Sequence, residues 1–556
     1  MNEWIMILGA GVMQEPALRA AGEMGLKTLA VDANPNAPWA SLAGRFECVD
    51  LKDKDGLLAL ASSLEGKEKI SGVMTAGTDF SASVAWVAEH LGLPGIPYET
   101  ALDASDKSRM RGRFALAGLP SPPFAVFEKL PGVPALPFPY PAVVKPVDNM
   151  GGRGCRRVDG PSALEAALKD ALAFSGKGRA IVEAFMDGPE YSVDALVSGG
   201  EVIICGLADR HIFFPPYFIE MGHTMSAVLD EKSSAALLDV FVRGVKALGI
   251  HTGAAKGDIK LTPQGPMIGE IAARLSGGYM SGWTYPYASG VDPVRGAIEI
   301  ALGRRPSRTS PLRQWTSAER AFISIPGRVK AIRGIREAEQ KGYVKNIFIR
   351  VQRGSPIGFP ENNVGKAGNV ISQAPVREQA VVAAEEAARS IGIELEVPNA
   401  ETEAFLGSFF EEGRPSFPPD AFALSPSLRS ALLALPCPGQ RSGTGQATAS
   451  TTAAGSPAAA AVAEVPPATA AGSPAGPCIC PFPEFTGSDL VDYTGRSVGA
   501  SLDMVREILG LKLPIKEGGV LGRRFWAGLV RGGYQGAAYI AALTLGERGE
   551  GRPGGT

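Results

Sequence analysis

The chain has 556 residues, of which 45% are hydrophobic, enough for roughly two to four domains with substantial apolar cores. Its 55 basic and 57 acidic residues leave a formal net charge of −2, which argues against a nucleic-acid-binding surface or a polybasic membrane patch. No run reaches the roughly 18 apolar residues of a transmembrane helix, and the first five residues lack the basic segment of a signal peptide. We therefore expect a cytoplasmic protein with no membrane or nucleic-acid partner.

The six cysteines do not form an obvious framework. They are Cys48, Cys155, Cys205, Cys437, Cys478 and Cys480. We expect reduced, unpaired thiols, as in most cytosolic proteins. A metal site on the Cys478–Cys480 pair would need further ligands, and all four histidines lie far upstream, so we predict no cysteine-bound metal.

The first 105 residues alternate short apolar runs with helical patterns. The runs cover residues 5–8, 28–31 and 72–74, and a helical pattern separates the first two. Such alternation is typical of parallel strands joined by helices that cover both faces of a sheet. We predict a Rossmann-like α/β domain over residues 1–105.

The next segment, residues 106–305, has antiparallel character. Short β-prone runs cover residues 142–144, 180–182, 192–197 and 202–207, and helical patterns cover residues 162–174 and 233–248. Gly199-Gly200, between the last two runs, is a hairpin signal. This segment is predicted to be an α+β domain.

The last part of the chain changes composition twice. Residues 306–400 are basic and strand-rich with a helical pattern over 377–391, and we expect a C-terminal subdomain there. Residues 426–477 form a low-complexity linker, predicted to be disordered because its few large apolar groups cannot bury enough surface to offset the entropy of ordering. Residues 478–556 are a tail of unknown role, with helical spacing at 501–511 and an apolar, glycine-rich run at 525–543. That tail either docks on the body or forms a small separate element, and its final residues, 549–556, are expected to be disordered.

Gly9-Ala10-Gly11 follows the first predicted strand, with Asp32 about 20 residues further on. A dinucleotide site requires a third glycine in the pattern G-x-G-x-x-G, and that position holds Gln14. Glu15 follows it, and its carboxylate would repel a pyrophosphate. We interpret this segment as a tight strand-to-helix turn, with a non-dinucleotide substrate at the strand ends as the alternative.

A stronger signal comes from several motifs that occur in order. They are Ser105-Asp106-Lys107 at the start of a helix, Lys145 at the end of a strand, the loop Asn149-Met150-Gly151-Gly152-Arg153-Gly154, the run Glu183 to Asp194 with Glu190 inside it, and Asp258 followed by Glu270 and Arg274. Lysine ammonium groups and glycine-rich backbone both suit phosphate oxygens. Asp258 and Glu270 are separated by the turn-like segment 262–266, so a hairpin would bring the two carboxylates together as magnesium ligands.

This ordered set resembles the ATP-grasp superfamily, and within it the biotin carboxylase and carbamoyl-phosphate synthase branch and the L-amino-acid ligases. The resemblance covers about residues 1–400 and includes Gly327-Arg328-Val329 and Gly368-Asn369-Val370-Ile371, which look like the C-terminal subdomain of that branch. It implies an ATP-grasp fold preceded by the Rossmann-like domain.

The resemblance also implies a role for each residue of the set. Lys107 and Lys145 would contact the α- and β-phosphates, and Gly151, Gly152 and Gly154 would form a mobile loop over the phosphates. Glu183 and the backbone from Ala184 to Met186 would meet the adenine, and Glu190 the ribose. Asp258 and Glu270 would ligate Mg²⁺, with Mn²⁺ as the alternative ion. Arg274, together with Lys145, would act in catalysis by steadying the transferring phosphate or the acyl phosphate.

Two positions depart from the family pattern. Ala272 stands where many members have a metal-binding Asn, and Asp258 stands where Glu is common. Loss of the Asn ligand puts a second metal ion in question. Some ligase-like members also have Glu-Ile-Ala-Ala-Arg, so Ala272 does not by itself imply inactivity.

The resemblance implies a carboxylate–amine ligase. A carboxylate would attack the γ-phosphorus of ATP, magnesium and lysines would offset the negative charge, and an amine would displace phosphate from the acyl phosphate. On the substrate side, Arg274 to Tyr279 suits an anionic group or is simply a turn after the metal strand. Glu220 to Thr224 is similar to a segment near the acceptor site of amino-acid ligases, or His223 is an ordinary polar loop residue. Trp283, Tyr285 and Tyr287 either wall a pocket or pack in the core.

Two alternatives remain open at this point. One is an enzyme that phosphorylates bicarbonate, as biotin carboxylase does, although the chain lacks the Met-Lys-Met motif of a biotin carrier. The other is a nucleotide-binding module without turnover, which Ala272 favours. The expected partners are a small-molecule carboxylate and an amine, and analogy with relatives implies a homodimer.

Overall fold

The computed structural model describes residues 3–64, 68–130, 135–436 and 477–547, and these residues divide into two units. Unit 1 comprises residues 1–324, 334–352 and 358–391, and unit 2 comprises residues 325–333, 353–357 and 392–556. The segment predicted as the C-terminal subdomain, residues 306–400, contributes to both units. Within the described residues, no helix is both long and apolar enough to cross a membrane.

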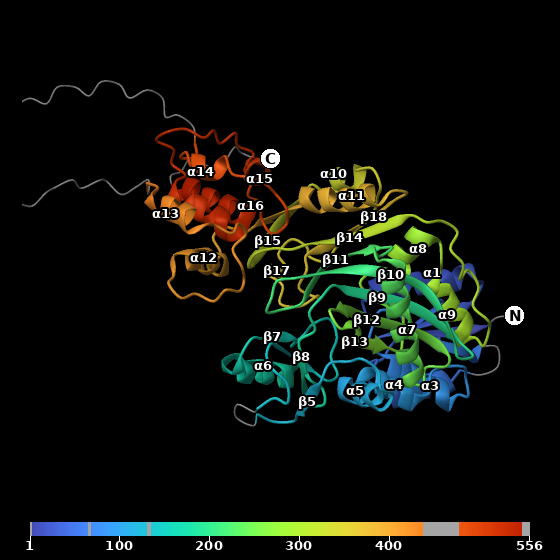
Figure 1. Ribbon diagram of the computed structural model, residues 1–556. Coiled ribbons are helices and arrows are strands. Elements are labelled where there is room, and N and C mark those ends of the chain that lie inside the picture. Colours follow the sequence, from blue (N-terminus) through green and yellow to red (C-terminus); the bar gives the residue numbers. More distant parts are fainter. Residues whose placement is uncertain (1–2, 65–67, 131–134, 437–476, 548–556) are drawn as a thin grey trace, which may run out of the picture. The chain divides into compact units, whose positions relative to one another are not determined.

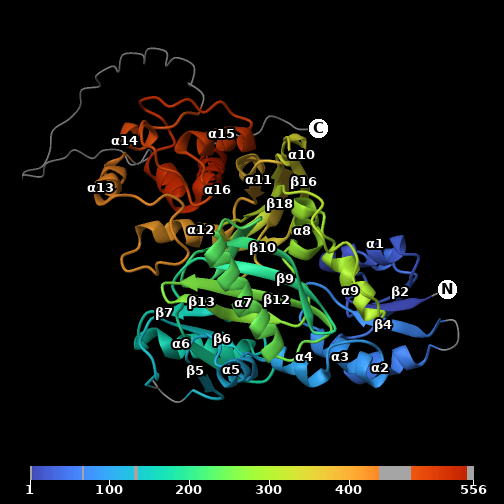
Figure 2. The same ribbon diagram turned by 45° about the vertical axis from the view of Figure 1, so that its right-hand side comes forward.

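The N-terminal part of unit 1 is a four-stranded parallel sheet in the order β3-β2-β1-β4. The strands are β1 (Trp4–Leu8), β2 (Lys27–Asp32), β3 (Arg45–Cys48) and β4 (Ile70–Met74). Helices α1 (Glu15–Glu23) and α9 (Pro293–Ala301) cover one face, and α2 (Lys54–Ser62) and α3 (Ser81–His90) cover the other (Figure 2). Both faces of the central strand β1 are buried, which explains its uninterrupted apolar sequence. The prediction of a parallel sheet with helices on both faces is confirmed.

A second, antiparallel sheet of unit 1 has the order β5-β8-β6-β7. Its strands are β5 (Phe124–Phe127), β6 (Ala142–Pro146), β7 (Arg156–Val158) and β8 (Ala180–Ala184). Helix α6 (Pro161–Phe174) buries Leu164, Ala167, Leu168 and Ala171 against one face. The helix is visible beside these strands in Figure 1. The other face of β6 and β8 is left to carry polar side chains.

The largest sheet has eight strands in the order β13-β12-β9-β10-β11-β14-β18-β16. The strands are β9 (Glu190–Ser198), β10 (Glu201–Phe213), β11 (Ile219–Met225), β12 (Gly253–Thr262), β13 (Gly265–Ala272), β14 (Thr316–Phe322), β16 (Val344–Ile349) and β18 (Gly368–Ala374). Gly199 and Gly200 join β9 to β10 as predicted, both with positive φ, 60° and 82°. All neighbours in this sheet are antiparallel.

Helices cover this sheet at both ends. Near β12 and β13 lie α5 (Lys107–Leu116) and α7 (Glu231–Ala247), and near β14, β16 and β18 lie α10 (Ile335–Gln340) and α11 (Arg377–Ser390). Short elements link them: α4 (Tyr98–Ser105), α8 (Tyr285–Ser289), the 3-10 turns η1 (Val12–Gln14) and η2 (Ala40–Leu42), and the π-helical turn η4 (Met280–Thr284). Phe114 and Phe241 are completely buried where α5 and α7 meet β12 and β13.

Unit 2 is built on a three-stranded sheet, β17-β15-β19. Its strands are β15 (Gly327–Arg333), β17 (Pro356–Ile357) and β19 (Gly392–Leu395). Its other elements are α12 (Ala400–Gly407), η5 (Ser408–Phe410), α13 (Pro426–Ala434), α14 (Pro483–Thr486), α15 (Val498–Leu509) and α16 (Arg523–Glu547). Figure 1 shows α13, α14 and α15 gathered around α16. Helix α16 also packs against β19 and α12 of the same unit. The tail therefore docks on the rest of unit 2.

Part of the predicted linker is structured. Residues 426–434 form helix α13. Ser425 caps this helix by accepting a hydrogen bond from the Leu428 amide at 3.3 Å. Residues 437–476 of the predicted linker and the expected disordered end, residues 549–556, lie outside the described residues. The five cysteines within the described residues are unpaired, as expected.

Candidate active site

The turn Gly9-Ala10-Gly11 is filled by the protein itself. The Gln14 side chain accepts a hydrogen bond from the Gly11 amide at 3.1 Å and donates one to the Ala76 carbonyl at 2.5 Å. A Cβ on Gly9 would lie 2.8 Å from the Gln14 carboxamide. Because Gln14 occupies the space beside the glycines, the turn offers no room for a pyrophosphate. The interpretation as a strand-to-helix turn agrees with this geometry.

A cavity of about 380 Å³ lies in unit 1 between the four-stranded antiparallel sheet and the eight-stranded sheet. Eleven of the twelve predicted site residues line it: Lys107, Lys145, Gly151, Gly152, Glu183, Ala184, Met186, Glu190, Asp258, Glu270 and Arg274. The exception is Gly154, where a Cβ would instead lie 3.0 Å from Phe174 of α6. A cavity of this size falls in the usual range of small-molecule sites.

Lys107 opens helix α5 at the floor of the cavity. Asp106 caps the helix by accepting hydrogen bonds from the amides of Ser108 and Arg109. The buried Lys107 ammonium donates to the Asn149 carbonyl at 2.9 Å and lies 3.2 Å from the Glu270 carboxylate. Burial tends to lower the pKa of Lys107, but the nearby carboxylates, Glu270 first, raise it above its usual value. Lys107 is therefore a fixed positive charge.

Lys145 and Glu183 form a buried ion pair across strands β6 and β8. The Lys145 ammonium lies 2.6 Å from Glu183, whose other oxygen accepts from Nε of Arg111 at 2.8 Å. Burial opposes ionisation of Glu183, but Arg111 and Lys145 outweigh it and hold its pKa below the usual range. Arg111 also donates to the Gly269 carbonyl at 2.6 Å. Glu183 thus orients Lys145 toward the cavity. Because both oxygens of Glu183 already have partners, its carboxylate is less available for the predicted contact with adenine.

The glycine-rich loop is held by Asn363. Gly151, Gly152 and Gly154 have φ values of 68°, 77° and 67°, a region that favours glycine. The Gly151 carbonyl accepts a hydrogen bond from the Asn363 amide at 2.9 Å, and the Asn363 side chain accepts one from the Glu220 amide at 2.8 Å. Asn363 therefore ties the loop to strand β11.

One end of the cavity is apolar. Val143, Phe185, Met186, Ile212 and Phe218 line it, and the rings of Phe185 and Phe218 are stacked with centroids 6.5 Å apart. The Lys260 ammonium lies over Phe185, 5.3 Å from the ring centroid. This wall suits a flat, apolar ring, while the lysines beyond it suit an anion.

Arg210, which the sequence analysis did not single out, is the centre of the charged surface. Its guanidinium contacts Glu190, Glu220 at 2.8 Å and Asp258 at 2.9 Å. Burial alone would lower the pKa of Arg210, but Asp258 and the other carboxylates raise it well above its usual value. Arg210 also lowers the pKa of Glu220 to about 2, against the effect of burial. Three carboxylates from three different strands therefore surround one guanidinium.

The two predicted metal ligands face each other across the hairpin. The predicted hairpin brings the two acids together: Asp258 is the partner of Glu270 in the antiparallel pair β12 and β13, next to a register shift between Asp258 and Ile259. Asp258 Oδ2 is bound by Arg210 and by Lys256, whereas its Oδ1 is buried and has no hydrogen-bond partner among the described residues. Burial tends to raise the pKa of Glu270, but Lys107, Lys256 and Lys145 together hold it well below its usual range.

This donor set fits one magnesium ion. Mg²⁺ commonly takes one or two carboxylate oxygens and completes its shell with phosphate oxygens and water. The unpartnered Oδ1 of Asp258 and the ionised Glu270 supply that number. Within the described part of the chain no cluster of three or more His, Cys, Asp or Glu side chains could hold a metal by itself.

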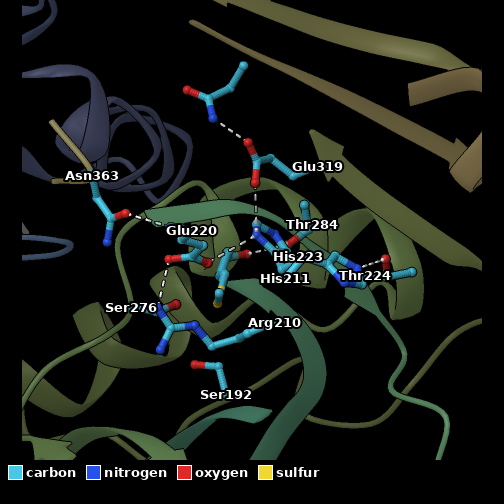
Figure 3. Close-up of polar contacts among 12 residues, drawn as sticks. Ser192, Arg210, His211, Glu220, His223, Thr224, Ser276, Thr284, Glu319 and Asn363 are labelled. Atoms are coloured by element: carbon cyan, nitrogen blue, oxygen red, sulfur yellow. Dashed lines mark hydrogen bonds and ion pairs between the residues drawn. The ribbon is translucent and has the colours of Figure 1, made fainter. Parts of the chain in front are cut away.

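A buried polar chain extends from the cavity behind Glu220 (Figure 3). Nδ1 of His223 lies 3.8 Å from Glu220 and 3.3 Å from Glu319, and its Nε2 lies 2.9 Å from the Thr284 hydroxyl. Glu319 also accepts a hydrogen bond from Asn369. His223 is fully buried and does not line the cavity, so Glu220 is the member of the predicted 220–224 segment that faces a ligand.

Arg274 lies where the cavity meets the N-terminal sheet. It donates to the Leu275 carbonyl at 3.0 Å, lies 3.9 Å from Asp79, and its buried Nε has no hydrogen-bond partner in the described chain. The loop after it is anchored by Asp194, which accepts from the Ser276 hydroxyl at 2.5 Å. Burial raises the pKa of Asp194 to about 6, although Ser276 and Lys256 oppose it. Arg274 is thus a cation with donor capacity to spare.

The Asp194 pKa gives a test of this anchor. Its folded-state pKa of about 6 lies above the ordinary value of 3.8, so ionisation of Asp194 opposes folding as the pH rises. Relative to Asp194→Asn, the native chain should lose roughly 3 kcal/mol of stability between about pH 4 and pH 8. Urea unfolding across that range checks this, with exposed Asp239→Asn as the matched control. A stability difference between the native chain and Asp194→Asn that stays constant with pH would contradict the assignment.

The aromatic residues divide between wall and core. Tyr285 is fully buried and donates to the Ser192 carbonyl, Tyr287 donates to Asn346, and Trp283 packs edge-on against Phe348. Core packing therefore explains these three. Tyr279, which stacks on Phe348 with centroids 4.2 Å apart, lines the cavity instead.

Comparisons with known proteins agree with this geometry. Residues 138–282 match the ATP-grasp domain family, and residues 321–396 match the family L-amino acid ligase C-terminal domain 2. The structure is similar to the L-amino acid ligase from Bacillus licheniformis, with 25% identity, a TM-score of 0.63, and coverage of 71% of this chain and 99% of that one.

Two further matches are more distant. The biotin carboxylase of Campylobacter jejuni, 22% identical with a TM-score of 0.54, covers 71% of this chain and 92% of its own, and shows the shared fold. Carnosine synthase 1 of Gallus gallus is 25% identical over 377 residues, which are 62% of this chain and 40% of that protein. The chain thus spans well under half the length of that relative. The predicted resemblance to the ATP-grasp superfamily is confirmed.

Proposed function

We propose that this chain, which is an ATP-grasp ligase, activates the carboxylate of a small molecule with Mg-ATP and joins it to an amine. The observation that carries the proposal is one cavity in which an apolar wall, two buried lysines and a pair of facing carboxylates follow one another. The matches to ATP-grasp and L-amino acid ligase families support it.

For the nucleotide, we assign the apolar wall at Phe185 and Met186 to adenine and Glu190 to the ribose. The predicted contacts of Ala184 and Glu183 with adenine remain part of this proposal. Glu183 shares its carboxylate between Arg111 and Lys145, so the backbone of 184–186 is the better partner. Lys107, Lys145 and the loop with Gly151, Gly152 and Gly154 would bind the phosphates.

For the chemistry, the lysines reduce the repulsion between an anionic carboxylate and the γ-phosphate. Asp258 and Glu270 would hold magnesium, which would offset charge on the phosphate oxygens. Arg274 has an unsatisfied Nε beside the cavity and would bind the acyl phosphate oxygens as charge moves onto them. The glycine loop, fastened by Asn363, would exclude water from that reactive intermediate.

For the substrates, the cations near Arg274 favour an anionic group. Lys366 is buried, lines the cavity, and donates to the Glu220 carbonyl at 2.9 Å, with no carboxylate within ion-pair distance in the described chain. Arg350 lines the same side. One of the similar structures is an L-amino acid ligase, so an amino acid is the first substrate to try. A cytoplasmic location and a dimer are part of this proposal by analogy alone.

The test is release of ADP and phosphate from ATP against a panel of amino acids, singly and in pairs, and bicarbonate. We expect phosphate release that requires both a carboxylate and an amine, with an amide detected by mass spectrometry. Release with bicarbonate alone would support the carboxylase alternative instead. ATP binding without release for any pair would support a module without turnover.

A further inference from the structure

Lys256 lies next to the two carboxylates proposed to hold magnesium. It precedes Asp258 by two residues on β12, so both side chains emerge on the same face of the strand. In the antiparallel register Lys256 is opposite Ala272, and Asp258 is opposite Glu270. The four positions form a square whose corners are a lysine, an aspartate, a glutamate and an alanine.

The ammonium of Lys256 is directed into this square. It donates a hydrogen bond to Oδ2 of Asp258, its side chain is only 13% exposed, and it lines the cavity. It also helps to hold the pKa of Glu270 down, after Lys107. Lys256 therefore acts electrostatically on both acids.

The cations already beside these acids limit how many divalent ions can bind there. Glu190, Glu220 and Asp258 surround Arg210, Lys256 pairs with Asp258, and Lys260 lies 3.9 Å from Glu190. Glu270 is paired with Lys107. A second divalent ion beside Asp258 would meet the Lys256 ammonium at close range. The methyl group of Ala272 could not ligate it.

We infer that Lys256 supplies the positive charge that a second divalent cation would otherwise bring, so that the chain binds its nucleotide with a single metal ion. A lysine ammonium is a compact point charge with several donors, suited to phosphate oxygens. The inference rests on the proposed function, because it assumes that Asp258 and Glu270 bind the metal of a nucleotide.

Counting bound Mn²⁺ tests this without turnover. The chain, in excess over β,γ-imido-ATP so that all nucleotide is bound, is titrated with Mn²⁺ while free Mn²⁺ is measured by electron paramagnetic resonance. The native chain should bind one Mn²⁺ per nucleotide. The double variant Lys256→Met with Ala272→Asn, which removes the ammonium and adds an amide ligand, should bind two.

Matched variants sharpen the outcome. Lys246→Met removes an exposed lysine on α7, outside the cavity lining, and should keep one Mn²⁺. Lys256→Met alone should weaken binding of the imido nucleotide about tenfold at fixed Mn²⁺, since one charge beside the phosphates is lost.

Three results would overturn the inference. They are two ions in the native chain, one ion in the double variant, or unchanged nucleotide affinity in Lys256→Met. A native chain that binds nucleotide with no metal at all would contradict the proposed function itself, and the native titration distinguishes that failure from the other three.

Discussion

Glu270→Gln should reduce turnover by about a thousandfold or more while leaving the fold intact. The substitution keeps the shape of the side chain but removes the charge that faces Asp258 and pairs with Lys107. The Lys107 ammonium, buried beside it, would lose its closest carboxylate. The measurement is the rate of ADP formation with the best substrate pair, together with a thermal unfolding curve.

The control for this variant is Glu165→Gln, because Glu165 is exposed on α6 and does not line the cavity. It should leave the rate unchanged. The variant Lys145→Ala should also abolish turnover, since Lys145 is the cation that Glu183 holds toward the cavity. Normal rates in both Glu270→Gln and Lys145→Ala would contradict the site assignment.

Trp526→Ala should destabilise unit 2 by about 3–5 kcal/mol, the usual cost of removing a large buried ring. Trp526 is fully buried in α16, donates to the Cys480 carbonyl at 2.9 Å, and packs against the rings of Phe482, Phe485 and Phe525. The measurement is urea unfolding of the full chain. The control is Trp315→Ala, because Trp315 is 38% exposed, and its effect should stay below about 1 kcal/mol.

The tail also completes hydrogen bonds of the unit it covers. The Ile393 amide of β19 donates to the Tyr534 hydroxyl at 2.8 Å, and the Asn399 amide donates to the Tyr539 hydroxyl at 2.5 Å. A chain that ends before residue 478 would lose both hydroxyl acceptors and expose the apolar face of β19 to water. A Trp526→Ala variant as stable as the native chain would show that the tail is not part of the core.

The sequence predicted those features that depend on neighbouring residues. Short apolar or β-prone runs located β1, β2, β9 and β10, and helical patterns located α6 and α7. Glycines located the hairpin at Gly199-Gly200 and the loop at Gly151. The turn-like segment between Asp258 and Glu270 indicated a hairpin that brings the two acids close together, but not their exact pairing, which depends on a register shift between Asp258 and Ile259.

The charged partners of the cavity were not predictable in this way. Arg111 contacts Glu183 and Gly269, which are 72 and 158 residues away. Arg210 meets three acids brought by different strands, and Asn363 joins β11 to a loop far upstream. Such contacts are decided only when the helices, loops and two antiparallel sheets of unit 1 pack together. Arg210 and Lys256 carried the one local signal of such contacts, because each is a basic residue in a partly buried strand.

The glycine turn near the N-terminus shows the opposite case, where a local signal was informative because a residue was missing. Gln14 replaces the third glycine of a dinucleotide motif, and its side chain fills the space that a pyrophosphate would need. The same argument applies to Ala272. It stands opposite Lys256, and its methyl group takes the place of an Asn side chain that could bind a second metal ion.

Transfer of oxygen from the carboxylate to phosphate tests the central claim most directly. With a substrate whose carboxylate carries ¹⁸O, an acyl phosphate must pass one labelled oxygen to the phosphate released when the amine attacks. We predict inorganic phosphate with one ¹⁸O for each amide formed, and ADP without label. Unlabelled phosphate, or label in AMP, would contradict activation of the carboxylate as an acyl phosphate.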